Sequence, residues 1–173
     1  MQAEKITDIK KELQTLNPKA LTEICLRLAR YKKENKELLS YLLFEADDAL
    51  AYAEKIKTAY SDEFAGLGRN NFQNIKIVKR ILRAVSKHAK YTGSKEAEIE
   101  LLIWFCSNLV KQTNLNSAYK VLQNTLTRQL TKINNTLSKL HEDLQFDYRK
   151  EFEKLIEEVE VRWLHFNKKD YGL

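Results

Sequence analysis

The stretch NKELLSYLLFEADDALAYAEKIKTAYSDEFA, residues 35–65, decides the predicted fold. At about 100° per residue, its apolar side chains cover most of the circumference of a helix. An ordinary surface helix has an apolar arc only somewhat wider than about 100°. We therefore predict one long helix over residues 35–65 that other helices enclose. Asn35 is its expected N-cap, and Gly66 is expected to follow its end in a left-handed conformation.

Glu45 falls near the middle of the apolar face of this predicted helix. Two interpretations are open. In the first, Glu45 is a buried polar tie that pairs with Arg27, Arg30 or a tyrosine hydroxyl of a neighbouring helix. In the second, burial raises its pKa and makes it a functional acid. No second inward-facing acid is evident that would form a catalytic pair with it.

The rest of the chain supplies helices that could enclose this one. The 173 residues include one Pro and four Gly, whereas sheets need turns rich in these residues. Apolar periodicity predicts further helices over 3–16, 19–33, 71–91, 94–113, 117–144 and 147–166. Asn17 followed by Pro18, Ser94 and Asp147 are the expected start signals of three of them. The helix over 94–113 is apolar nearly all round, so it is expected to be a second buried element. We therefore predict an all-α fold of about seven antiparallel helices. It is either a short α-α superhelix, as in HEAT-like arrays, or an irregular helical bundle.

The length of the chain suits one domain. We expect a single all-helical domain over residues 1–167 and a frayed tail over 168–173. Cys25 and Cys106 are far apart in apolar helical stretches, so both are predicted core residues without a disulfide. Two thiols of this kind, and an N-terminal segment without an apolar signal core, favour a cytoplasmic protein. No apolar run is long enough to predict a membrane span.

The charge of the chain is unevenly distributed. The net charge is +6, made up of −1 over residues 1–63, +10 over 64–141 and −3 over 142–173. The cations of the middle block recur at helical spacing, opposite the apolar residues of the predicted helices over 71–91 and 117–144. The candidate binding residues are Lys76, Lys79, Arg80, Arg83, Lys87 and Lys90, together with Arg128, Lys132 and Lys139.

Three interpretations of this basic face are open. It can be an ordinary solvated face, matched within the chain by the glutamates of the acidic last helix. It can bind an acidic protein partner or a second copy of the chain. It can also bind a phosphate backbone, in which case binding weakens with salt. Lysines outnumber arginines 22 to 8, and since Lys lacks the bidentate geometry of Arg, such binding would be weak and without sequence preference.

Motifs that carry chemistry are missing from the sequence. His88, His141 and His165 are scattered on different predicted helices, and no spacing resembles a zinc, di-iron, P-loop or nucleophile motif. We therefore expect no enzyme, no cofactor, no metal and no small-molecule substrate. The favoured function is a helical protein-interaction or scaffold module with a basic face. The alternative is weak nucleic-acid binding through the basic helix 71–91.

Overall fold

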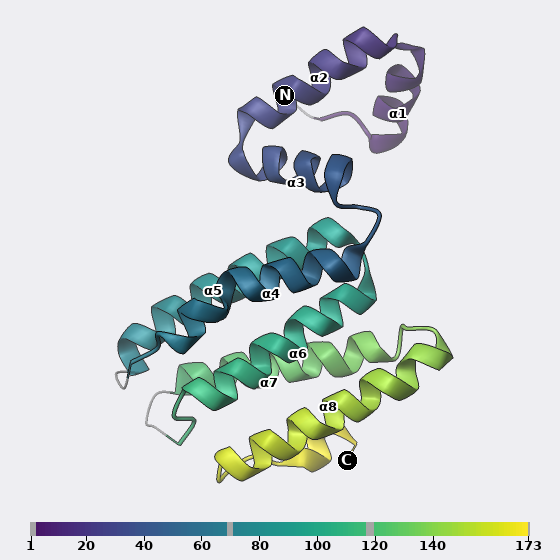
Figure 1. Cartoon of the computed structure of the whole chain (residues 1–173). Helices are drawn as coiled ribbons and strands as arrows, with labels where there is room; N and C mark the ends of the chain where they lie inside the picture. The colour runs from purple at the N-terminus through teal and green to yellow at the C-terminus, as the bar shows by residue number, and fades with distance from the viewer. Residues whose placement is uncertain (1–2, 69–70, 117–119, 173) are drawn as a thin grey trace. The chain divides into compact units, whose positions relative to one another are not determined.

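The computed structural model describes residues 3–68, 71–116 and 120–172, except for the side chain of Asn71. Over these residues the chain is helical and contains no strand (Figure 1), which confirms the predicted all-α class. The α-helices are α1 Ile6–Thr15, α2 Pro18–Tyr31, α3 Lys33–Phe44, α4 Ala49–Ala65, α5 Asn71–Thr92, α6 Lys95–Gln112, α7 Lys120–Leu137 and α8 Glu142–Arg162. A short 3₁₀ helix, η1, follows over Lys168–Tyr171.

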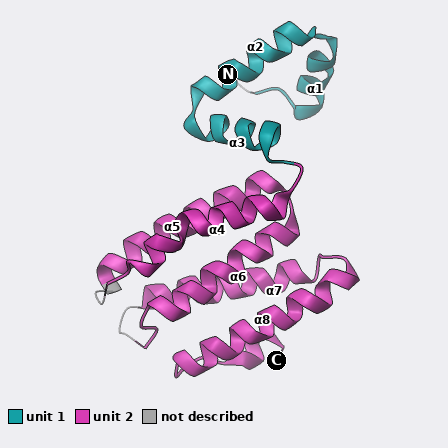
Figure 2. Ribbon diagram, in the orientation of Figure 1, with its two compact units in different colours: residues 1–46 teal, residues 47–173 magenta. Residues whose placement is uncertain are grey.

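The chain divides into two compact units, shown in separate colours in Figure 2. Unit 1 is Met1–Ala46 and holds α1, α2 and α3. Unit 2 is Asp47–Leu173 and holds α4 to α8 with η1. Whether the two units fold as the one domain expected for residues 1–167 stays a prediction.

Unit 1 is built on the packing of α2 against α3. Asn17 begins α2 as predicted: its side-chain oxygen accepts a hydrogen bond from the Ala20 amide at 2.9 Å, and Pro18 occupies the first turn. Among the described side chains of this unit only Tyr41, 4% exposed, is buried. Unit 1 therefore has very little core of its own.

Unit 2 is organised around α6, which packs against α4, α5, α7 and α8. The sequence predicts that this helix is a buried element, and eight of its residues are buried, among them Phe105, Cys106 and Leu109. Phe105 meets Phe64 of α4 edge to face, with ring centroids 5.6 Å apart. Ser94 caps α6 as expected, since its hydroxyl accepts from the Ala97 amide at 3.2 Å.

The predicted long helix over residues 35–65 is wrong. Residues 45–47 form a turn, and the chain restarts as α4 where the Asp48 carboxylate accepts from the Ala51 amide at 2.9 Å. The acidic run over 45–48 explains the break, because negative charge disfavours a helix C-terminus and favours an N-terminus. The first half is also not enclosed: Leu42 is 55% exposed. Gly66 has φ −80°, so it is not left-handed either.

Three further local expectations differ from the structure. The predicted helix over 117–144 ends at Leu137, and α8 begins at Glu142 instead of being capped by Asp147; residues 117–119 lie outside the described part. In the expected frayed tail, residues 168–171 form η1, and Tyr171 is buried against the rings of Phe152 and Phe166. Cys106 is buried as predicted, but Cys25 is exposed.

Candidate functional site

The predicted basic face on residues 71–91 lies on α5, a single helix of unit 2. Lys76, Lys79, Arg80, Arg83 and Lys90 are exposed, while Ile81 and Val85, on the apolar side, are fully buried. Three of the predicted cations, Arg83, Lys87 and Lys90, line a shallow hollow of about 470 Å³ together with Tyr91. The helical spacing therefore identified the exposed side of α5 correctly.

Two arginines of this face make polar contacts outside α8. Arg80 makes an ion pair with Glu63 of α4 at 2.8 Å, and the Arg83 Nε donates to the Lys79 carbonyl at 3.2 Å. On α8, Glu158 pairs with Lys111 of α6 at 3.4 Å and Glu160 pairs with Lys168 at 3.0 Å. The two α8 glutamates therefore form ion pairs with cations that lie outside α5.

The second group of predicted cations is less uniform. Arg128 is exposed on α7, but Lys132 is bound to Glu98 of α6 with Nζ and Oε1 2.5 Å apart. Lys139 lies after the end of α7, where its backbone carbonyl accepts from Lys95 Nζ at 3.0 Å. The structure thus places these residues on different elements and commits Lys132 to an intramolecular ion pair.

Glu45 does not lie on a buried helical face, because the helix that would carry it ends at Phe44. Glu45 is half-buried in the turn after α3, and its backbone amide donates to the Tyr41 carbonyl at 2.9 Å. The pairing of its side chain with Arg27, Arg30 or a tyrosine stays a prediction.

A polar cluster that the sequence did not reveal ties α4, α6 and α8 together. The Glu100 carboxylate accepts from Lys57 Nζ at 2.5 Å through one oxygen and from the Tyr148 hydroxyl at 3.1 Å through the other. Lys57 also donates to Glu54 at 2.6 Å, and the Tyr148 hydroxyl lies 3.1 Å from an oxygen of Glu96. We call Lys57, Glu100 and Tyr148 the polar clasp.

The charges in the polar clasp keep both donors protonated. Burial lowers the pKa of Lys57, but its hydrogen bonds to Glu100 and Glu54 outweigh burial, so the pKa is raised overall. Burial, with the negative charges of Glu100 and Glu96, raises the pKa of the Tyr148 hydroxyl. A protonated ammonium and a neutral phenol are poor nucleophiles and poor bases. The polar clasp is therefore suited to holding three helices together.

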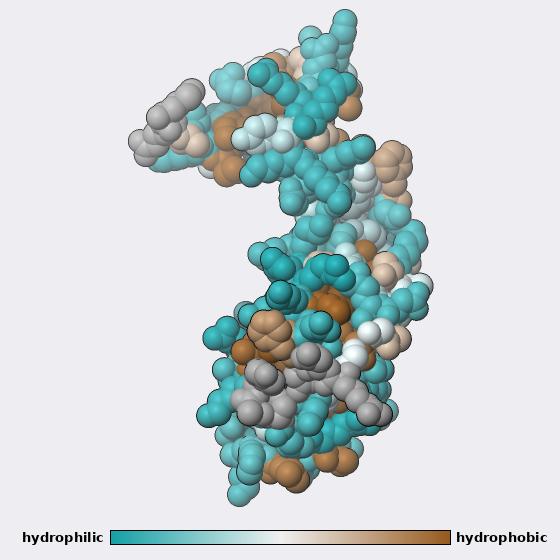
Figure 3. All heavy atoms as spheres, turned by 90° about the vertical axis from the view of Figure 1, so that its left-hand side faces the viewer, coloured by the Kyte–Doolittle hydropathy of each residue, from teal (hydrophilic) through white to brown (hydrophobic). Residues whose placement is uncertain are grey.

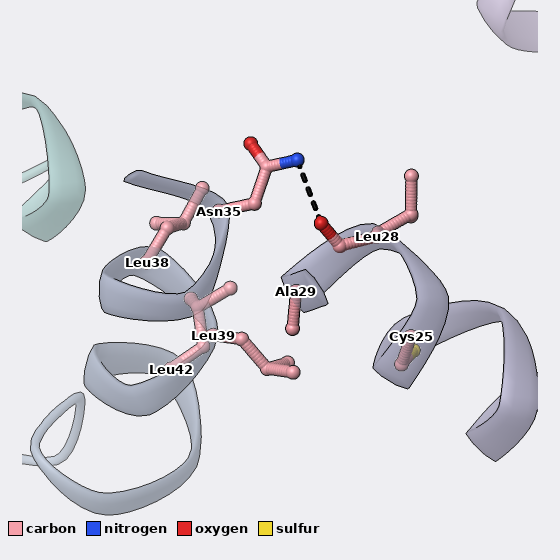
Figure 4. A pocket seen from close by; sticks show the side chains of 7 residues that line it. All are labelled: Cys25, Leu28, Ala29, Asn35, Leu38, Leu39 and Leu42. Carbon is pink, nitrogen blue, oxygen red and sulfur yellow. Dashed lines mark hydrogen bonds between the residues drawn. The ribbon is translucent and has the colours of Figure 1, made fainter. Parts of the chain in front are cut away.

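The apolar hollow of unit 1 lies between α2 and α3 (Figure 4). Its volume is about 280 Å³, and no charged residue lines it. Asn35 closes one end, where its side-chain amide donates to the Leu28 carbonyl at 2.9 Å. The lining residues are Cys25, Leu28, Ala29, Asn35, Leu38, Leu39 and Leu42.

A second and larger hollow, the basic hollow, shares Ala29 and Leu39 with the apolar hollow and has a volume of about 600 Å³. Its apolar lining is Leu26, Ala29, Leu39, Leu43 and Phe44, and its charged lining is Arg30, Lys32, Lys33 and Lys36. Leu43 is 64% exposed and Phe44 79% exposed. Figure 3 shows atoms of hydrophobic residues, in brown, at the surface of unit 1 in the upper part of the view.

Sequence reasoning missed both hollows, although a signal was present. The amphipathic patterns over residues 3–16 and 19–33 identify apolar helix faces, and such faces require a cover. In the structure α1 and α2 contain no buried residue. The hydrophobic pattern thus predicted where the apolar faces lie, but it did not predict that their residues remain accessible to solvent.

Comparisons with protein-family models, with curated proteins and with solved structures found no match to this chain. As far as the chain is described, none of its helices has the length and apolar character needed to cross a membrane. In the same residues no three His, Cys, Asp or Glu side chains are grouped so that they could hold a metal ion.

Proposed function

We propose that the chain is a non-enzymatic helical protein-interaction module and that unit 1 supplies its binding face. The observation that carries this proposal is the exposure of Leu42, Leu43 and Phe44 in a unit whose only buried described side chain is Tyr41. Soluble proteins seldom leave a contiguous apolar patch uncovered, and such patches mark interaction surfaces. Unit 2, with its core around α6, serves as the stable body of the module.

Site-specific photo-crosslinking in cells tests this function. A photoreactive phenylalanine analogue at position 44 is expected to give a discrete protein adduct. The same analogue at Ile6, an exposed apolar position of α1 that lines neither hollow, is the matched control. The proposal fails if position 44 gives no adduct, or if both positions give the same products.

The alternative function, weak nucleic-acid binding without sequence preference, is favoured by the exposure of Lys76, Lys79 and Arg83 along α5. A rigid helix with cations at positions i, i+3 and i+7 can follow a phosphate backbone. Binding of a random duplex should then weaken steeply with salt, with a slope of about −0.9 per phosphate contact on logarithmic axes.

The variant Lys76→Glu, Lys79→Glu, Arg83→Glu should abolish duplex binding, because it reverses three cations on one face. It leaves Arg80, which pairs with Glu63, unchanged. The matched control carries three reversals in unit 1, at Lys5, Lys10 and Lys19, all exposed. Equal binding by the α5 variant and the control in a fluorescence-anisotropy titration would rule out this alternative.

A further inference from the structure

The basic hollow of unit 1 combines apolar and positively charged surface in one place. Leu39 and Leu43 are four residues apart on α3, so they lie on the same side of the helix, and Phe44 follows at its end. Leu26 contributes apolar surface from α2. Two helices that meet beside exposed leucines form the kind of depression into which the apolar stripe of a third helix packs.

The charge around this hollow has one sign. The four charged residues that line it are all cations: Arg30 and Lys32 at the end of α2, and Lys33 and Lys36 at the start of α3. Lys33 makes an ion pair with Glu37 at 3.8 Å, and ion pairs near the surface are weak. The residues that line the hollow thus offer positive charge, and no carboxylate is among them.

We propose that the basic hollow binds an amphipathic helix of a partner protein whose apolar stripe is flanked by carboxylates. This inference rests on the proposed interaction function and adds the chemistry of the partner. The stripe would cover Leu43 and Phe44, and the carboxylates would face Arg30 and Lys36. Cations at the edge of an interface attract an acidic partner and raise its association rate, while buried apolar contacts slow its dissociation.

A second copy of the chain fits this hollow less well. Its most acidic helix, α8, packs Phe152, Leu155 and Val159 into the core of unit 2. A second copy could not offer the apolar side of α8 without opening that core. A partner of separate sequence has no such constraint.

The test uses the full chain and labelled helical peptides about 15 residues long, the length at which isolated helices begin to be stable. One peptide carries a leucine stripe flanked by glutamates. The second carries the same stripe flanked by lysines, and the third has the glutamate composition with the leucines dispersed around the helix. Only the first is expected to bind, and anisotropy titrations and stopped-flow mixing measure the affinity and the two rates.

Two pairs of variants separate the apolar contribution from the charged one. Leu43→Ser with Phe44→Ser should raise the dissociation rate about tenfold or more, and Ile6→Ser is its control. Arg30→Glu with Lys36→Glu should slow association about tenfold and flatten its salt dependence. Lys10→Glu with Lys19→Glu is the control for charge. Far-UV circular dichroism and urea unfolding of each variant show whether the full chain remains folded.

The outcomes separate this inference from the proposed function. If the lysine peptide binds as tightly as the glutamate peptide and Leu43→Ser with Phe44→Ser weakens both, the partner chemistry is wrong and the interaction face stands. If no peptide binds, the inference fails while the crosslinking test still decides the function. The inference is overturned if the chain self-associates and the variant Leu43→Ser with Phe44→Ser abolishes that association, because a second copy is then the occupant. It is also overturned if duplex DNA displaces the peptide, because DNA is then the occupant.

Discussion

At the scale of single residues, the carboxylate of Asp48 sets the start of α4. One of its oxygens accepts from the Ala51 amide at 2.9 Å, so Asp48→Ala leaves that amide without its cap and removes a negative charge from the helix N-terminus. We expect a loss of about 1 kcal/mol in the free energy of unfolding, measured in urea. Asp48→Asn keeps an acceptor and should lose much less; an equal loss would show that the cap is not the cause.

Gly93 connects α5 to α6 in a left-handed conformation, with φ 62°. A side chain in this conformation is strained, so Gly93→Ala should destabilise the protein by about 1–2 kcal/mol. Gly68 is a matched control, since a Cβ there would meet no atom within 4 Å and its φ lies outside the left-handed range. Gly68→Ala should be neutral or slightly stabilising in the same thermal unfolding measurement. Similar losses at both positions would contradict the argument.

Lys57 contributes to stability through its ion pairs to Glu100 and Glu54. Lys57→Met leaves the half-buried Glu100 with one donor fewer, so we expect a loss of about 1–3 kcal/mol at neutral pH. Lys90→Met, at an exposed position of α5, should change the free energy of unfolding by less than about 0.5 kcal/mol. In a double-mutant cycle with Glu100→Gln, additive losses would show that the two side chains are not coupled.

The raised pKa of Lys57 determines in which direction its contribution to the free energy of unfolding changes with pH. Because the folded-state pKa lies above the ordinary value of 10.5, the stabilisation is fully present below that value and is lost as pH rises through the folded-state pKa. The difference between the original protein and Lys57→Met should therefore be constant at neutral pH and should shrink in strongly alkaline solution. Urea titrations across this range measure it, and a difference that grows with pH would contradict the assignment.

At the scale of elements, α6 holds unit 2 together. Phe105→Ala removes a fully buried ring that packs on Phe64, so we expect a loss of about 3–5 kcal/mol. Phe44→Ala removes the same side chain from an exposed position of α3 and should cost less than about 0.5 kcal/mol. Calorimetric or urea unfolding of both variants makes the comparison, and losses of similar size would contradict the placement of the core in α6.

Helix positions were largely predictable because their signals are local. Asn17 with Pro18, and Ser94, mark the starts of α2 and α6 as predicted. The break before Asp48 was missed because the apolar positions Leu38 and Leu42 continue in phase into Ala49 and Ala53, so one helical period describes two helices. Apolar periodicity alone cannot predict a turn of this kind. The acidic run over 45–48 indicates one, because negative charge disfavours a helix C-terminus and favours an N-terminus.

The polar clasp and the hollows depend on tertiary packing, which local patterns do not contain. Lys57 and Glu100 are 43 residues apart, and Glu100 and Tyr148 are 48 apart. The exposed side of α5 was predictable because a basic stripe and its apolar opposite recur within one helix. For unit 1, the amphipathic pattern shows that a face needs a cover, but it does not show whether the same chain provides it.

At the scale of the whole molecule, the unequal cores of the two units predict unequal local stability. Unit 1 buries Tyr41 alone among its described side chains, while α6 in unit 2 has eight buried residues. Segments with few buried contacts open with small free energies, and core helices approach the global value of about 5–15 kcal/mol. Native-state hydrogen exchange of the full chain should therefore show amides of α2 and α3 exchanging about a hundredfold or more faster than those of α6. If α2 and α6 exchange at the same rate, the chain opens as one cooperative unit, as expected for a single domain over residues 1–167.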